Sequence, residues 1–365
     1  MSSLLRQMED RIRQRMARKL PTWAQTDGIL PPSSLALEQC SSETTAQFKA
    51  SLVSGGRLVD LTGGYGVDCC LMSRRFHHTD YVERQPDLAE TARHNFALLG
   101  ASIQVHNTDA ESFLNAMEPA DCIYMDPARR NTHGSKVVSL TECTPDVVRL
   151  HDLLLERCDT LLLKLSPAHD LAEALRLYPE TQAVYVVGAQ GECKELLLLA
   201  GPGVPEGGEP LIRCWDGREL LAFRPSDERN AVVRYTAPEA YLYEPDATLL
   251  KAGAFKYTAQ HYGLGKLHPN SHLYTSAERI EGFPGRTFAV RQCLKTHDKA
   301  LKALGKANLT VRNFPASVAD LRKKWKLADG GPLYLLATTL ADGSHRILVC
   351  EKTGPETEAT QPGCG

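Results

Sequence analysis

The stretch RLVDLTGGYG, residues 57–66, decides the fold. An apolar run ends in Asp60 and then turns through three glycines, Gly63, Gly64 and Gly66. Glycine allows a tight turn and lets a ligand approach the backbone where a Cβ would collide. A helix that follows such a turn offers free N–H groups to an anionic or carboxylate group. The stretch therefore predicts a buried strand, a ligand-binding turn and a helix.

The same pattern recurs through the first half of the chain. Apolar runs with polar ends start at residues 57, 78, 102, 122 and 160, and helical segments such as PDLAETARHNFALLG lie between them. Two further strands are predicted at 183–190 and 194–201. Alternation of strands with helices predicts an α/β fold with a Rossmann-like, doubly wound parallel sheet. In such sheets ligands bind beyond the carboxyl ends of the strands.

Changes in composition and in hydrophobic pattern along the sequence predict four regions. They are an N-terminal helical segment (1–50), the α/β domain (51–235), a basic α+β domain (236–355) and a tail (356–365). We expect the first region to hold helices over about 5–16 and 33–50. In the third region we expect a lysine-rich helix at 295–306, a strand at 308–313 and a basic helix at 317–327.

Charge is distributed unevenly along the chain. Residues 251–330 contain 15 Lys and Arg against 5 Asp and Glu, a net charge of +10, whereas residues 51–250 contain 18 against 30, or −12. The basic stretch suits a polyanion such as RNA. Its densest cluster is LRKKWK, residues 321–326, for which a solvated helix face is the alternative interpretation.

Composition limits the class of protein. The hydrophobic content of 42% and the charged content of 24% are typical of a globular chain. No apolar run approaches the ~20 residues of a membrane span, and no secretory signal is recognisable, so we expect a cytoplasmic protein without a membrane partner. The eleven cysteines lack the spacing of a zinc site, so we expect no metal.

Acidic residues close four successive predicted strands: Asp60, Glu83, Asp109 and Asp126. A carboxylate at the second position can accept hydrogen bonds from both ribose hydroxyls of a nucleoside. Together the four acids suit a ligand with a positive charge. The dinucleotide fingerprint is incomplete, because Cys69 stands where its third glycine belongs, and this counts against a nicotinamide oxidoreductase, which stays an alternative.

This ordered set resembles the class I S-adenosylmethionine-dependent methyltransferases. DLTGGYG resembles their glycine-rich first motif, and MDPAR, residues 125–129, resembles their fourth motif, D/N-P-P-Y/F/W. VRNFP, residues 311–315, followed by LRKKWK is similar to the THUMP-like domain found behind bacterial methyltransferases of this kind. The resemblance implies S-adenosyl-L-methionine as the cofactor, bound by Asp60, Gly63, Gly64, Gly66, Glu83 and Asp109.

The resemblance also implies how the acceptor is held. Asp126 and the Pro127 carbonyl would orient an amino group, which predicts methyl transfer to a base nitrogen of RNA, ribosomal or transfer. The aromatic residue of the motif is replaced by Ala128-Arg129, so Arg129, Arg130 and Lys164 are the predicted substrate-binding residues.

Other functions stay open at this stage. DPAR also resembles the DPPR motif of uracil C5 methyltransferases, but those enzymes need a cysteine shortly after the fifth strand, where this chain reads Lys164-Leu165-Ser166-Pro167, so C5 transfer is disfavoured. A non-catalytic RNA-binding protein with a methyltransferase fold, and a methyltransferase acting on a small molecule or a protein, are the remaining alternatives.

Overall fold

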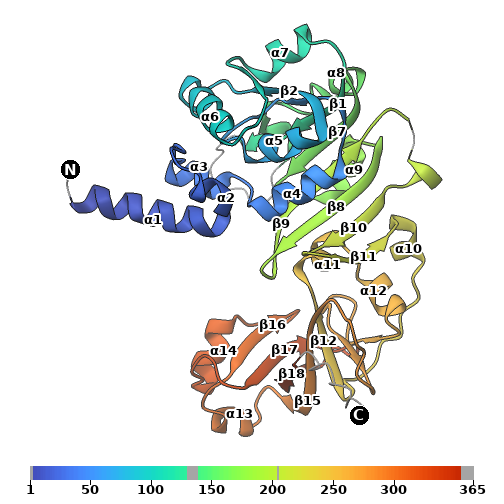
Figure 1. Cartoon of the computed structure of the whole chain (residues 1–365). Helices are drawn as coiled ribbons and strands as arrows, with labels where there is room; N and C mark the ends of the chain where they lie inside the picture. Colours follow the sequence, from blue (N-terminus) through green and yellow to red (C-terminus); the bar gives the residue numbers. More distant parts are fainter. Residues whose placement is uncertain (1–2, 130–138, 204, 355–365) are drawn as a thin grey trace, which may run out of the picture. The chain divides into compact units, whose positions relative to one another are not determined.

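The computed structural model describes residues 3–129, 139–203 and 205–354 (Figure 1). The chain divides into two compact units, one of residues 1–187 and 194–212, the other of residues 188–193 and 213–365. The N-terminal helices belong to the first unit. The division near residue 213 lies ahead of the boundary at 235 that the sequence suggests, and the four predicted regions stay a prediction.

The N-terminal segment is helical, as predicted, but one predicted helix is two. Its helices are α1 (Ser3–Lys19), α2 (Pro21–Gln25), α3 (Ser34–Gln39) and α4 (Glu43–Leu52). The prediction of a single helix over 33–50 is wrong, because Ser42 starts a new helix by accepting a hydrogen bond from the Thr45 N–H at 3.2 Å. The break leaves Ser41 between the two helices.

A large sheet, whose parallel strands all belong to the first unit, confirms the doubly wound prediction. Its strand order is β11-β10-β8-β9-β7-β4-β1-β2-β3. Strands β1, β2, β3, β4 and β7 pair in parallel, whereas β9 is antiparallel to β7. The parallel strands therefore present their carboxyl ends along one edge. The strand bounds are β1 (Gly55–Asp60), β2 (Phe76–Val82), β3 (Gln104–His106), β4 (Ala120–Met125), β7 (Cys158–Leu165), β8 (Thr181–Ala189), β9 (Glu192–Ala200), β10 (Leu211–Trp215) and β11 (Glu219–Phe223).

Apolar runs place these strands in the core. Leu58, Val59, Ile123 and Leu161 are fully buried, as expected for strands covered on both faces. The remaining helices are α5 (Val67–Met72), α6 (Pro86–Leu98), α7 (Ala110–Ala116), α8 (His151–Glu156) and α9 (Leu171–Leu177), with short turns η1 (Ser73–Arg75), η2 (Leu140–Glu142) and η3 (Glu206–Gly208). Two short strands, β5 (Ala128–Arg129) and β6 (Cys143–Thr144), pair with each other.

The second unit is built on a seven-stranded sheet of order β13-β14-β12-β15-β18-β17-β16. Its strands are β12 (Tyr241–Pro245), β13 (Gly265–Lys266), β14 (Tyr274–Ser276), β15 (Gly285–Lys295), β16 (Asn308–Arg312), β17 (Leu333–Thr339) and β18 (His345–Lys352). Its helices are α10 (Pro225–Asn230), α11 (Ala247–Ala252), α12 (Lys256–His261), α13 (Ala300–Ala303) and α14 (Val318–Trp325). The predicted strand at 308–313 and helix at 317–327 correspond to β16 and α14.

The predicted lysine-rich helix at 295–306 is wrong. Strand β15 continues to Lys295, because its last residues pair with β18, where Lys295 lies opposite Arg346. Only residues 300–303 are helical. Pairing with a neighbouring strand overrides the local preference for helix.

Helices α13 and α14 cover the same face of this sheet (Figure 1). Leu301 of α13 and Leu321 and Trp325 of α14 pack into one core cluster with Leu335 and Ile347 of the sheet. Exposed lysines on and next to the two helices therefore lie over this side of the sheet, and we call them the basic face: Lys299, Lys302, Lys306, Lys323, Lys324 and Lys326.

Of the helices that the structure describes, none is both long enough and apolar enough to cross a membrane. Within the same residues, no group of three or more His, Cys, Asp or Glu side chains is placed to hold a metal ion.

Candidate active site

The glycine-rich loop follows β1 and leads into α5, as predicted. Two of its glycines are required by packing: a Cβ on Gly63 would lie 2.3 Å from the ring of Tyr81, and one on Gly66 would lie 2.6 Å from the ring of Phe96. Gly64 has a φ of +58°, and a Cβ there would meet no heavy atom closer than 3.7 Å. Gly63 and Gly66 thus let the loop pack closely on Tyr81 and Phe96, and the positive φ of Gly64 is a conformation that glycine adopts without strain.

Asp60, at the end of β1, is buried at the base of this loop. Its Oδ1 accepts a hydrogen bond from the Thr62 N–H at 2.9 Å. Burial raises the pKa of Asp60, the hydrogen bond from Thr62 opposes this, and the nearby carboxylates of Asp68, Asp126 and Glu83 add to it, so that the pKa is about 8. A buried acid of this kind gains from a cation placed beside it.

Glu83, at the end of β2, accepts hydrogen bonds from the backbone of the glycine-rich loop and of its own strand end. Its Oε2 accepts a hydrogen bond from the Gly64 N–H at 2.9 Å, and its Oε1 accepts one from the Gln85 N–H at 2.8 Å. The Tyr81 hydroxyl donates to the Gly64 carbonyl at 2.5 Å. The backbone of the loop is therefore fixed to β2 at two points.

Thr62 joins the ends of β1 and β4. Its N–H donates to Asp60, and its Oγ1 accepts a hydrogen bond from the Asp126 N–H at 2.6 Å. The structure thus brings together three of the four predicted acids, Asp60, Glu83 and Asp126, around one loop.

Asp109 has a different local role. It caps α7, where its side chain accepts hydrogen bonds from the Ser112 N–H at 2.9 Å and the Ser112 hydroxyl at 2.7 Å. These bonds lower the pKa of Asp109. The side chain is exposed, and its part in binding adenine stays a prediction.

Lys164, near the end of β7, contacts Asp126 directly. Its Nζ donates to Asp126 Oδ2 at 2.6 Å and to Ser41 Oγ at 3.3 Å. It also lies 3.7 Å from Asp68 Oδ2 and 3.9 Å from Glu195 Oε2. Burial alone lowers the pKa of Lys164, but these three carboxylates outweigh burial and hold it above its usual value, so the side chain is a cation at neutral pH.

A second buried lysine, Lys49, contacts two of the carboxylates that surround Lys164. Lys49 of α4 is fully buried, and its Nζ lies 2.6 Å from Glu195 Oε1, 3.2 Å from Asp68 Oδ1 and 3.0 Å from Ser41 Oγ. We call this set of residues, Ser41, Lys49, Asp68, Lys164 and Glu195, the lysine network. Asp126 stands at its edge with its side chain 38% exposed.

Asp68 connects the two lysines. Its Oδ2 accepts hydrogen bonds from the hydroxyls of Ser41 and Tyr124, each at 2.8 Å. Burial would raise the pKa of Asp68, but the ammonium groups of Lys49 and Lys164, with these hydrogen bonds, lower it overall. The carboxylate therefore stays ionised between the two cations.

Sequence reasoning identified Lys164 and missed the rest of the lysine network. A charged residue in an apolar strand was the signal for Lys164, and the same signal marks Glu195 in KELLLLAG, residues 194–201. Asp68 and Lys49 lie on helices, where a charge is ordinary. Only the packing of α4 and α5 against the sheet reveals that Lys49 is buried and that Asp68 is largely shielded from solvent.

The predicted substrate arginines are described only in part. The backbone of Arg129 pairs with Cys143 in the small β5-β6 sheet. The Arg129 side chain and the whole of Arg130 lie outside the described residues, so their roles stay predictions. Pro127, the second predicted catalytic residue, is buried.

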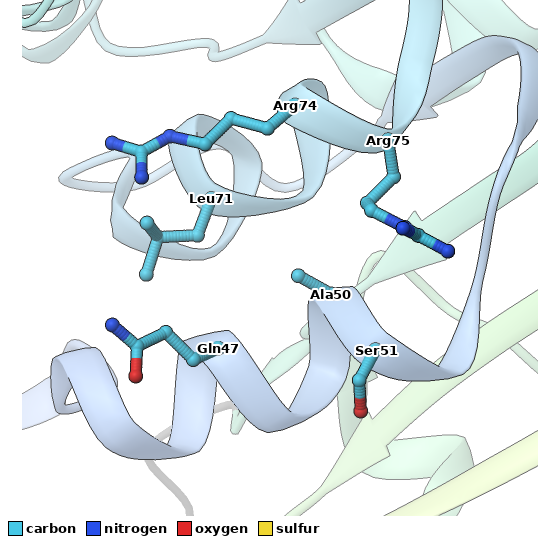
Figure 2. A pocket seen from close by; sticks show the side chains of 6 residues that line it. All are labelled: Gln47, Ala50, Ser51, Leu71, Arg74 and Arg75. Atoms are coloured by element: carbon cyan, nitrogen blue, oxygen red, sulfur yellow. The ribbon is translucent and has the colours of Figure 1, made fainter.

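A separate hollow of about 340 Å³ lies on α4, α5 and η1 (Figure 2). Leu71 and Gln47 face one another across it, and the other lining residues are Ala50, Ser51, Arg74 and Arg75. None of the predicted site residues lines this hollow.

Comparison with known proteins gives an extensive match to a solved structure. The crystal structure of the "putative methyltransferase from Porphyromonas gingivalis W83" is 37% identical, with a TM-score of 0.86 over 95% of this chain and 90% of that chain. Family models match a ferredoxin-like domain at residues 241–284 and a THUMP domain-like region at residues 285–352.

Other likenesses are slight. The structure of the T. thermophilus 16S rRNA N2 G1207 methyltransferase in complex with AdoMet and guanosine is 17% identical, with a TM-score of 0.33 over 48% of this chain and 44% of that one. Among curated proteins, none matches the chain.

Proposed function

We propose, from the premise that the chain belongs to the class I S-adenosylmethionine-dependent methyltransferases with a C-terminal THUMP-like domain, that it transfers a methyl group from S-adenosylmethionine to RNA. The observation that best supports transfer is the convergence of Asp60, Glu83 and Asp126 on one glycine-rich loop. These acids come from three parallel strands, at the edge where α/β sheets bind their ligands.

The residues of the first unit fit the proposed cofactor. Asp60, buried and with its pKa raised to about 8 by burial, lacks a cation that the methionine ammonium would supply. Each oxygen of Glu83 accepts one backbone hydrogen bond. A carboxylate has about four acceptor positions, so Glu83 retains capacity for the two ribose hydroxyls.

When bound, S-adenosylmethionine supplies an electrophilic methyl group on a sulfonium. The chain then has to align the acceptor with that methyl and exclude water. Asp126 is the group placed to touch the acceptor, because it lies at the end of β4 beside the loop and its side chain is partly exposed. The base nitrogen predicted from the sequence, with the Pro127 carbonyl as second acceptor of its hydrogen bonds, stays a prediction.

The second unit supports RNA as the substrate. Its basic face carries six exposed lysines on and next to two helices that pack on one core cluster. An extended positive surface neutralises the phosphates of a nucleic acid backbone, whereas a small metabolite needs no such surface. Ribosomal and transfer RNA are the classes that we propose, with the protein acting in the cytoplasm.

Two measurements test the proposal. Incubation of the full chain with tritiated-methyl S-adenosylmethionine and total RNA should label the RNA. In a thermal shift assay S-adenosylhomocysteine should raise the melting temperature and NADH should not. Stabilisation by NADH alone would favour the oxidoreductase alternative, and cofactor binding without labelled RNA would favour a non-catalytic protein or another acceptor.

A further inference from the structure

The acceptor side of the candidate site is dominated by an ammonium group. Lys164 contacts Asp126 at 2.6 Å, and this is the carboxylate that would touch the acceptor. The three carboxylates around Lys164 keep it protonated at neutral pH. Any acceptor at Asp126 is therefore placed close to a fixed positive charge.

Burying the charged groups of the lysine network costs desolvation free energy, so the network is an inefficient way to stabilise the fold. Lys49 is fully buried, and Lys164 is 9% exposed. Buried ion pairs lose much of their attraction to desolvation, and well-packed apolar residues often stabilise a protein equally well. Buried ions that surround an exposed acid are more typical of a functional site.

The positive charge of Lys164 favours methyl transfer to some acceptor atoms over others. When a neutral amine attacks a sulfonium methyl, its nitrogen becomes positively charged, and a neighbouring ammonium opposes that step. A hydroxyl loses its proton as it attacks, so its oxygen becomes more negative on the way to the transition state. An ammonium nearby stabilises that developing charge.

The sequence motif around Asp126 also favours a hydroxyl over an amino group as the acceptor. The relatives that methylate amines have an aromatic residue two positions after the proline, where this chain has Arg129, preceded by Ala128. A base taken out of its stack is usually held between aromatic or planar side chains. A ribose hydroxyl needs no such platform, because every nucleotide of an RNA chain presents one on its sugar.

We propose that the acceptor is the 2′-hydroxyl of a ribose in RNA, with Asp126 and Lys164 as the residues that touch it. This inference rests on the proposed function. A lone pair of the hydroxyl oxygen forms the new O–CH3 bond, the C–S bond breaks, and its electron pair returns to sulfur as a neutral thioether. The hydroxyl proton passes to the Asp126 carboxylate and from there to solvent.

The other members of the lysine network are positioning residues. Glu195 and Asp68 lie between the two lysines, and Lys49 holds Glu195 Oε1 at 2.6 Å and Asp68 Oδ1 at 3.2 Å. They keep Lys164 charged and aimed at Asp126. Their removal should lower kcat and leave the KM for S-adenosylmethionine unchanged.

Alkaline hydrolysis of the labelled RNA tests the proposal. Alkali cleaves RNA through attack of the 2′-oxygen on the adjacent phosphorus, so a 2′-O-methylated nucleotide survives as part of a dinucleotide. Full-length protein, tritiated-methyl S-adenosylmethionine and total RNA should give label in alkali-stable dinucleotides. Label in mononucleotides, as methylated bases, would overturn the inference while leaving the proposed function intact. RNA without label would overturn both.

Variants at Lys164 sharpen this test. Lys164→Met should lower the rate of methyl transfer about 100-fold or more, with S-adenosylhomocysteine affinity within about 3-fold of the wild type. Because Lys164→Met leaves two buried carboxylates less well compensated, Lys164→Arg serves as the second variant. It keeps the charge and should lose about 10-fold. Lys194→Met, at an exposed lysine beside Glu195, is the matched control and should retain the wild-type rate. Wild-type rates in Lys164→Arg and a folded Lys164→Met would overturn the proposed role of Lys164.

Discussion

The lysine network and the basic face hold their lysines in opposite ways. In the first unit, Lys49 and Lys164 are buried and lie 2.6 Å from carboxylates. In the second unit, the six lysines of the basic face are exposed on and next to two helices. Salt screens exposed charges strongly and buried pairs weakly. We infer that the first arrangement fixes reacting groups and the second supplies affinity for a polyanion.

The largest effect should follow from Asp126→Ala. Removal of the carboxylate should lower methyl transfer by about 10²–10⁴-fold, because the acceptor loses the group that orients it and takes its proton. S-adenosylhomocysteine binding should change little, since Asp60 and Glu83 remain. The assay is tritiated-methyl transfer at saturating RNA, at low and at high salt. Equal loss at both salt concentrations is expected, and an active variant would remove Asp126 from the mechanism.

The fold could be predicted from the sequence because its signals are local. Apolar runs with polar ends located β1, β2, β3, β4 and β7, and the glycines after Asp60 located the loop. Within the site, the acids at strand ends were predictable for the same reason.

What could not be predicted depends on contacts between distant segments. Lys49 and Glu195 are 146 residues apart in the chain and meet only because α4 packs on the sheet beside β9. Likewise, the pairing of β15 with β18 turned an expected helix into a strand at Lys295. Neither contact leaves a pattern within a single stretch of sequence.

The next largest effect should come from Lys49→Met. Glu195 and Asp68 would each lose a buried cation, and breaking a buried pair in this way costs about 3–5 kcal/mol of the free energy of unfolding. Urea unfolding of both proteins measures the change. The double variant Lys49→Met, Glu195→Leu should recover part of the loss, because it removes the uncompensated carboxylate. An unchanged urea midpoint in the single variant would mean that the lysine network is not buried as described.

A smaller effect is expected from four substitutions on the basic face. Changing Lys302, Lys306, Lys323 and Lys324 to Ala should weaken RNA binding roughly 10-fold at physiological salt and leave the fold intact, since all four side chains are exposed. The slope of log affinity against log salt should become shallower by up to about 3, at ~0.7 for each lost phosphate contact on a single strand. Filter binding across a salt series measures both. An unchanged slope would place the RNA elsewhere.

The smallest effect should be a pH-dependent gain of stability in Asp60→Asn. The pKa of Asp60 in the folded chain, raised to about 8 by burial, lies above that of the unfolded chain. The stability contributed by this group is therefore complete at acid pH and lost as pH rises through about 8. The melting temperature of Asp60→Asn should exceed that of the wild type by more at pH 9 than at pH 5. A constant difference would contradict the raised pKa.

The proposed function depends most on one claim, that acids at adjacent strand ends hold a cationic nucleoside beside the glycine-rich loop. Calorimetric titration of S-adenosylmethionine into the wild type and into Glu83→Gln tests this directly, because glutamine can still accept from the Gly64 N–H but lacks the charge and one acceptor oxygen. We predict saturable one-to-one binding to the wild type and a loss of affinity of about 10-fold or more in the variant. Equal affinity of the two proteins, or no heat with either, would contradict the account.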